Sequence, residues 1–257
     1  MKIAILYICT GKYDLFWKDF YLSSEKYFLC NAEKSYFVFS DAEEIFAEEE
    51  YNVYKIFQKN LGWPGNTLFR YEIFLTQKDR LKTFDYIFFL NANMLFLQPI
   101  EDDILPPSGL LVVQHPGYYS AGRNNFPYDR NKKSLAYISP KEGEVYICGG
   151  FNGGTASAFL KMADVIAKNT KEDYSHDIVA RWHDESHINH YILNHEYKLL
   201  SPEYAYPEGV ALPFECKVLI RDKNKYGGHE FLRGQNEHVY IKIIKLLKRA
   251  YKFMFGD

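Results

Sequence analysis

The stretch Tyr86-Ile-Phe-Phe-Leu-Asn-Ala-Asn93 establishes the fold class. Apolar residues fill positions 86–90 without a break, which is typical of a strand buried on both faces, as parallel strands covered by helices are. The strand runs directly into Asn91 and Asn93, whose i, i+2 spacing puts both side chains on one face. Ligands of open α/β sheets bind beyond the carboxyl ends of the strands. The stretch therefore predicts a central strand that ends in an amide pair at the ligand-binding edge.

The flanking sequence supplies the partners of this strand. An apolar run over 3–8 is followed by a helical pattern over 14–29 and a second strand over 36–39, which together make a β-α-β unit. A further strand over 110–113 delivers His115 to the same edge. We expect an α/β protein with a mostly parallel central sheet.

The remaining segments are expected to be helical, glycine-rich or loop-like. Helical spacing covers 67–82, 155–168 and 173–195. The run Gly149-Gly-Phe-Asn-Gly-Gly154 indicates a backbone that turns sharply or closely approaches another group. Residues 118–147 are rich in Asn, Lys, Pro and Tyr, which favours a lid or binding loop over an idle connector.

Composition excludes several classes. The 257 residues are 47% hydrophobic and 25% charged, enough for one large domain with a sizeable core. Lys plus Arg total 31 against 33 Asp plus Glu, so the net charge of −2 gives no reason to expect nucleic-acid binding. Four cysteines without a C-x-x-C pair fit a reducing compartment. The apolar run over 3–9 is too short to span a bilayer and shows no cleavage site. We expect a cytoplasmic protein.

The C-terminal residues form a separate pattern. We expect a single domain over 1–238 and a basic amphipathic helix over 239–257, with five Lys or Arg residues beside an apolar face. Such a helix suits peripheral contact of residues 239–255 with the inner, anionic face of a membrane. Packing of the helix on the domain is the alternative.

A polar cluster lies in the predicted helix over 173–195. His183 and His187 are spaced i, i+4, which admits a zinc hydrolase, although Asp184 stands where the catalytic acid of such enzymes is expected. Asp184 and Glu185 are adjacent carboxylates, and burying them is costly unless they are paired or used. A sugar-binding module that uses the many aromatic residues for recognition alone is a further alternative.

The amide pair bears on metal binding. Asn91 and Asn93 are neutral and lack the negative charge that holds a hard cation. We therefore expect no metal ion and no other cofactor at this strand end.

An ordered set of motifs makes a family resemblance specific. The motifs are Trp63 with Arg70 and Glu72, Asn91-Ala-Asn-Met94, His115-Pro-Gly-Tyr-Tyr119, Ala136-Tyr-Ile138, Gly149-Gly-Phe-Asn-Gly-Gly154, Trp182-His-Asp-Glu-Ser-His-Ile-Asn189 and Ser201-Pro-Glu-Tyr204. The set spans roughly residues 3–235 and resembles glycosyltransferase family 6, which includes the histo-blood-group A and B transferases and α1,3-galactosyltransferase. The bacterial members of that family carry N-A-N in place of D-V-D, as this chain does.

The resemblance implies a fold and a reaction. The fold is the glycosyltransferase A type (GT-A), with a Rossmann-like nucleotide-binding half. The reaction is retaining transfer of Gal or GalNAc from a UDP donor, in α1,3 linkage, onto a β-galactoside that often carries fucose. Small residues at the positions of Gly117 and Gly150 accompany GalNAc transfer in the family, so we expect UDP-GalNAc as donor and a fucosylated, H-antigen-like oligosaccharide or glycolipid as acceptor. UDP-Gal is the alternative donor.

The resemblance also assigns residues. Glu185 matches the catalytic carboxylate, which retention uses either as a nucleophile in two inversions or to stabilise an oxocarbenium-like ion during same-face return. His115 and Trp182 match the acceptor site. Donor specificity falls on Gly117, Cys148, Gly149 and Gly150, and nucleotide or donor binding on Ile8, Thr10, Tyr13, Trp63, Arg70, Asn91, Asn93 and Asp184.

Without a metal ion, cationic side chains must meet the charge of the diphosphate. The candidates are Lys223, Lys225, His229 and Arg233. Arg233 aligns with the arginine of the family's basic C-terminal segment. We assign Lys225 to the diphosphate beside it.

Overall fold

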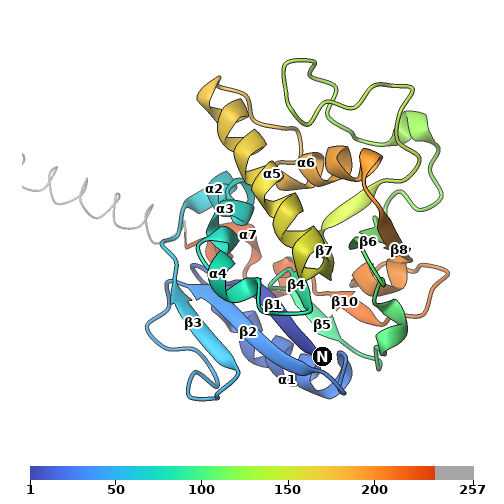
Figure 1. The fold of residues 1–257 in the computed structure, drawn as a ribbon. Helices are drawn as coiled ribbons and strands as arrows, with labels where there is room; N and C mark the ends of the chain where they lie inside the picture. Colours follow the sequence, from blue (N-terminus) through green and yellow to red (C-terminus); the bar gives the residue numbers. More distant parts are fainter. Residues whose placement is uncertain (235–257) are drawn as a thin grey trace, which may run out of the picture.

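The computed structural model describes residues 1–234 and shows a seven-stranded sheet in the order β3-β2-β1-β4-β7-β6-β8 (Figure 1). Only β7 runs antiparallel to its neighbours in this sheet, so the prediction of a mostly parallel α/β sheet is confirmed. The strands are β1 (Lys2–Ile8), β2 (Glu33–Ser40), β3 (Val53–Phe57), β4 (Tyr86–Leu90), β6 (Leu110–Gln114), β7 (Ile147–Thr155) and β8 (Tyr197–Leu200).

Strand β4 lies in the middle of the sheet, between β1 and β7, as its unbroken apolar sequence predicts. Its residues Ile87, Phe88 and Leu90 have no solvent exposure. The two faces of β4 belong to different cores, with Phe88 in one and Ile87 in the other. Strand β4 is therefore covered on both faces, and Asn91 follows it directly at the edge of the sheet.

Helices cover the two faces of the sheet. Helix α1 (Trp17–Tyr27) packs Trp17 and Phe20 against Tyr7 of β1, and helix α5 (Ala156–Ser175) packs Phe159 beside Leu6 on the other face. Figure 1 shows α5 lying across the sheet, with α1 on the opposite side. The core is therefore two apolar layers that hold the strand ends in place.

Strand β7 contains the glycine-rich run, which the sequence did not identify as a strand. The close approach expected there is confirmed: a Cβ atom at Gly153 would lie 2.2 Å from Cδ1 of Phe88, and one at Gly154 would lie 2.4 Å from the carbonyl oxygen of Gly109. Glycine is thus required because β7 packs too closely against its neighbours to leave room for side chains.

The predicted helix boundaries need three corrections. The segment 67–82 is divided into α2 (Gly62–Leu68), α3 (Arg70–Leu75) and α4 (Lys78–Leu81). Helix α5 continues to residue 175. The helix expected over 173–195 is wrong: positive φ angles of 58° at Asp177 and 53° at His183 interrupt it. Helix α6 (Asp184–Tyr191) begins only at Asp184.

A second sheet, in the order β5-β10-β9, pairs β5 (Met94–Phe96) with two C-terminal strands, β10 (Val218–Ile220) and β9 (Tyr206–Pro207). Helix α7 (Gly228–Leu232) and the residues that flank it bring Lys223, His229 and Arg233 back to the main sheet. The remaining elements are 3-10 turns at Tyr13–Phe16, Asp102–Ile104, Arg123–Asn125, Ile192–Asn194, Pro202–Ala205 and Lys223–Tyr226.

The expected helix over 239–257 lies outside the described residues. No helix within residues 1–234 combines the length and apolar character needed to cross a membrane.

We predict that Gly153→Ala destabilises the protein, because its methyl group would collide with the Phe88 ring. Overpacking of a core costs roughly 1–3 kcal/mol, so the urea midpoint should fall. Gly122→Ala is the control, since nothing lies within 4 Å of its Cβ position and its φ is −83°. Equal midpoints for the two variants would contradict the packing of β7.

Candidate active site

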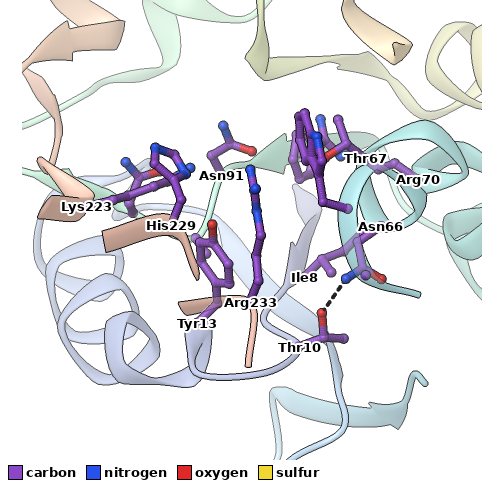
Figure 2. Close-up of a pocket in the computed structure, with 15 residues that line it drawn as sticks. Ile8, Thr10, Tyr13, Asn66, Thr67, Arg70, Asn91, Lys223, His229 and Arg233 are labelled. Atoms are coloured by element: carbon purple, nitrogen blue, oxygen red, sulfur yellow. Dashed lines mark hydrogen bonds between the residues drawn. The ribbon is translucent and has the colours of Figure 1, made fainter. Parts of the chain in front are cut away.

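A pocket of about 270 Å³ opens at the carboxyl ends of β1 and β4 (Figure 2). It contains every residue predicted for nucleotide binding except Asp184 and Lys225. These are Ile8, Thr10, Tyr13, Trp63, Arg70, Asn91, Asn93 and Arg233, joined by Gly62, Asn66, Thr67, Phe89, Ala92, Lys223 and His229. The topology thus brings together residues that are more than 200 positions apart.

Four basic residues give the pocket its charge. Lys223, His229 and Arg233 enter from the C-terminal elements and Arg70 from α3, while no carboxylate of the described chain lines the pocket (Figure 2). Burial, together with the nearby charges of Arg233 and Arg70, lowers the pKa of Lys223 to about 8. The guanidinium of Arg233 lies 4.2 Å from the centre of the Trp63 ring. Such a cationic, partly desolvated cavity is suited to a diphosphate.

The assignment of Lys225 to this pocket is wrong. Its ammonium group is exposed and lies 2.6 Å from Oε1 of Glu208. Within the 3-10 turn Lys223–Tyr226, residues two positions apart point in different directions, and Lys223 is the one that lines the pocket. Lys223, and not Lys225, therefore lines the pocket beside Arg233.

The amide pair has different surroundings at its two positions. Asn93 donates from Nδ2 to the carbonyl oxygen of Arg221 (2.7 Å) and accepts the backbone N–H of Arg221 on its own carbonyl oxygen (2.9 Å). Asn91 donates its backbone N–H to the carbonyl oxygen of Gly150 (2.8 Å). Asn93 thus fastens the basic C-terminal segment to the main sheet.

The donor set of the pocket does not fit a divalent cation. Its groups near Asn91 and Asn93 are neutral amides and cationic side chains, whereas Mn²⁺ and Mg²⁺ require carboxylate-rich oxygen ligands. Within residues 1–234, His, Cys, Asp and Glu side chains do not gather in groups of three or more that could hold a metal ion.

The zinc hydrolase alternative is contradicted by the geometry. His183 precedes α6 with φ at 53° and packs edge-on against Trp63, with 4.8 Å between the ring centres. His187 is buried inside the fold, 3.8 Å from Asp173. Because α6 starts after His183, the two histidines are not successive residues on one helix face.

The predicted catalytic carboxylate is held by two donors. Tyr146 donates its hydroxyl to Oε1 of Glu185 (2.5 Å), and Gly149 donates its backbone N–H to Oε2 (2.7 Å). Burial raises the pKa of Glu185 to about 7, and these two hydrogen bonds oppose that rise. The carboxylate thus lies between the first turn of α6 and the glycine strand β7.

The neighbouring carboxylate connects this group to the pocket. Asp184 accepts a hydrogen bond from Nη1 of Arg70 at 2.6 Å, and both side chains are buried. Burial raises the pKa of Asp184 to about 6, with the charge of Arg70 acting in the opposite direction. Since Arg70 also lines the pocket, it joins the cationic cavity to the start of α6.

The predicted acceptor residues and donor-specificity residues lie outside the lining of the pocket, and several of them are close to Glu185 or to its partner Tyr146. The His115 ring packs at an angle against Tyr146, with 5.6 Å between the ring centres, and burial lowers the His115 pKa to about 4. Trp182 is 46% exposed, and its carbonyl oxygen accepts the backbone N–H of Glu185. Gly117 donates its N–H to Nδ1 of His115.

The glycine pair is packed closely by functional side chains. A Cβ atom at Gly149 would lie 3.0 Å from Cβ of Glu185, and one at Gly150 would lie 2.7 Å from Nδ2 of Asn91. Cys148, directly before the pair, is buried, and its pKa is raised to about 12 by burial. The pair therefore allows Asn91 and Glu185 to approach the same strand from its two sides.

Several site residues escaped the sequence analysis, among them Tyr146 and Asn66. The only feature of the sequence that points to Tyr146 is its position directly before the glycine-rich strand β7. Asn66 ends the chain break at Trp63-Pro-Gly-Asn66 and donates to Oγ1 of Thr10 (2.9 Å), as Figure 2 shows. Neither position has a pattern that separates it from ordinary loop residues.

A cationic pocket beyond the carboxyl ends of a mostly parallel sheet defines a nucleotide-binding α/β protein. Comparison with known families then identifies which one. Residues 1–233 match the model of glycosyltransferase family 6, so the chain belongs to this family and the sheet is the core of a GT-A fold.

Several curated relatives agree. The chain is 36% identical over 225 residues to the O-antigen biosynthesis glycosyltransferase WbnI of Escherichia coli, covering 88% of this chain and 96% of the relative. It is 29% identical to globoside alpha-1,3-N-acetylgalactosaminyltransferase 1 of Gallus gallus, covering 87% and 68%. It is 31% identical to histo-blood group ABO system transferase 1 of Rattus norvegicus, covering 80% and 61%.

We predict that Asp184→Asn strongly destabilises the fold, because it leaves Arg70 buried without a counter-charge. Breaking a buried pair in this way costs about 3–5 kcal/mol, measurable as a loss of unfolding free energy in urea. Asp164→Asn is the matched control: its pair with Lys78 is about half exposed, and such pairs contribute less than about 1 kcal/mol. Comparable losses in both variants would contradict a structural role for the Arg70–Asp184 pair.

Proposed function

We propose that this glycosyltransferase moves GalNAc from UDP-GalNAc in α1,3 linkage onto a fucosylated β-galactoside, with retention of configuration and without a metal ion. The observation that carries the proposal is a cationic pocket that no carboxylate of residues 1–234 lines and that Arg70 joins to the buried carboxylates Asp184 and Glu185. The Gallus gallus relative, a globoside alpha-1,3-N-acetylgalactosaminyltransferase, supports the choice of sugar and linkage.

In this proposal, different residues of the pocket bind different parts of the donor. Ile8, Thr10 and Tyr13 hold the uridine at the end of β1, and Lys223 and Arg233 neutralise the diphosphate. Both cations come from the C-terminal segment that Asn93 fastens to the sheet. Burial and repulsion from Arg233 and Arg70 keep the pKa of Lys223 low, and a bound diphosphate would offset that repulsion.

Glu185 faces the anomeric carbon of the donor sugar. The bond from C1 to the diphosphate oxygen breaks with its electron pair on the leaving UDP, and the acceptor O3 forms the new bond to C1. The proton of the acceptor hydroxyl passes to the departing diphosphate. Glu185 either attacks C1 first or stabilises the oxocarbenium-like ion, and both routes require it ionised.

We assign the choice between the two donor sugars to the glycine pair Gly149 and Gly150. An N-acetyl group next to C2 needs space, and even one added methyl group in a tight pocket changes specificity by about 1–3 kcal/mol. The space beside Gly149 and Gly150 is bounded by Glu185 and Asn91, so an N-acetyl group there would lie against these two side chains. UDP-Gal is the second candidate donor.

Incubation with UDP-GalNAc or UDP-Gal and a fucosylated lactose, in EDTA, tests the proposal directly. We expect an α1,3-linked product with UDP-GalNAc, in higher yield than with UDP-Gal, and no increase on adding Mn²⁺. Glu185→Gln should bind UDP normally but lose at least about 100-fold in turnover, since it removes a transition-state charge worth several kcal/mol. Tight glycan binding without product would favour a sugar-binding module, and strict manganese dependence would contradict the cationic leaving-group site.

The pH dependence follows from the burial of Glu185, which raises its pKa to about 7 although the hydrogen bonds from Tyr146 and Gly149 oppose the rise. Because protonation disables the carboxylate, kcat/KM should fall as the pH drops below about 7. Tyr146→Phe removes a donor that favours the charged form, which raises the pKa, so this acidic limb should move upward by roughly one pH unit. Tyr128→Phe is the control, because Tyr128 donates instead to the carbonyl oxygen of Val145. If the acidic limb stays in place in Tyr146→Phe, Glu185 is not the group whose ionisation sets it.

A further inference from the structure

The end of the basic C-terminal segment is fastened by its backbone. Lys12 donates its N–H to the carbonyl oxygen of Leu232 (2.9 Å), and Asn60 donates from Nδ2 to the carbonyl oxygen of Arg233 (3.2 Å). Gly11, with φ at 68°, allows this approach, since its Cβ would lie 2.8 Å from the same Leu232 oxygen. Two loops of the main sheet therefore hold the backbone of Leu232 and Arg233.

Both the nitrogen and the oxygen of the Asn60 side-chain amide form hydrogen bonds. Its Oδ1 accepts the backbone N–H of Gly62 (2.9 Å) and Nδ2 of Asn66 (2.9 Å). Asn66 donates from the same nitrogen to Oγ1 of Thr10 and accepts the N–H of Leu61 (2.9 Å). A chain of amides thus runs from Thr10 at the nucleotide end of the pocket to the backbone of Arg233.

The same amide also fixes the surface on which the Arg233 side chain lies. Trp63 directly follows Gly62, and its ring is the platform for the Arg233 guanidinium at 4.2 Å. Asn60 therefore restrains the backbone of Arg233 and the loop that carries the stacking partner. Asn60 itself does not line the pocket.

We propose that Asn60 is a positioning residue that aims the Arg233 guanidinium at the diphosphate of the nucleotide. The inference rests on the proposed function for the presence of a diphosphate. It assigns Asn60 no contact with the ligand, so its effect passes entirely through Arg233. Loss of the Asn60 donor should weaken binding of a nucleoside diphosphate and spare binding of the nucleoside.

Asn60→Asp is the sharpest variant. It preserves the shape and the Oδ1 acceptor for Gly62 and Asn66, but it replaces the donor to Arg233 with an oxygen that faces a carbonyl oxygen. Asn60→Ala removes the donor without adding charge, together with the acceptor for Gly62 and Asn66, and it carries the test should the aspartate variant fail to fold. Asn224→Asp, an exposed change in the same basic segment, controls for the added negative charge.

Calorimetric titration of the full chain with UDP, and ligand-observed NMR with uridine, measure the effect in wild type, in each variant and in an Arg233→Ala background. We expect Asn60→Asp and Asn60→Ala to raise the Kd for UDP about tenfold, equivalent to about 1.4 kcal/mol, with uridine affinity unchanged and Asn224→Asp close to wild type. In the Arg233→Ala background, Asn60→Ala should have no further effect, because the two changes remove one interaction.

Two results would overturn the inference while leaving the proposed function intact. One is wild-type UDP affinity in Asn60→Ala. The other is an equal loss from Asn60→Ala with and without Arg233, which would make Asn60 a general structural residue. Wild-type protein that binds neither UDP nor uridine would overturn the proposed function itself, and the inference with it.

Discussion

The buried contact between Arg70 and Asp184 is the interaction on which the site depends. Arg70 is carried by α3 and lines the pocket, while Asp184 is the first residue of α6. Their 2.6 Å pairing ties the start of α6 to α3, and Glu185, the next residue, accepts the N–H of Gly149 in β7. Without this pair, the cationic pocket and the buried carboxylate would belong to separate parts of the molecule.

Charge is separated across this contact. On one side, Lys223, Arg233 and Arg70 share a pocket that no carboxylate of residues 1–234 lines, and burial together with the charges of Arg233 and Arg70 lowers the pKa of Lys223. On the other side, burial raises the pKa of Glu185 while Tyr146 and Gly149 stabilise its ionised form. A site with this polarity is suited to a reaction in which an anion leaves and positive charge develops at carbon. The neutral amides at the strand end fit this division, since Asn93 fixes the basic segment to the sheet.

Much of this architecture could be predicted from the sequence. The uninterrupted apolar residues 86–90 indicated the central strand, and the family resemblance placed Trp63, Arg70 and Arg233 at one pocket. Strand β7 escaped because its glycines indicate close approach without saying what is approached; the answer, the Phe88 ring, depends on tertiary packing. The start of α6 escaped because apolar spacing continues through His183, whose positive φ ends the pattern. Lys223 and Lys225 differ only in which side of a short turn they occupy, which their identical side chains do not reveal.

The most direct test of the central claim is a crystal structure of the Glu185→Gln protein with intact UDP-GalNAc, grown in EDTA. The account predicts the anomeric carbon about 3–3.5 Å from the side-chain oxygen of residue 185, and the diphosphate against Lys223 and Arg233 with no cation between them. A donor sugar bound away from residue 185, or a metal ion bridging the diphosphate to Asn91 and Asn93, would contradict it.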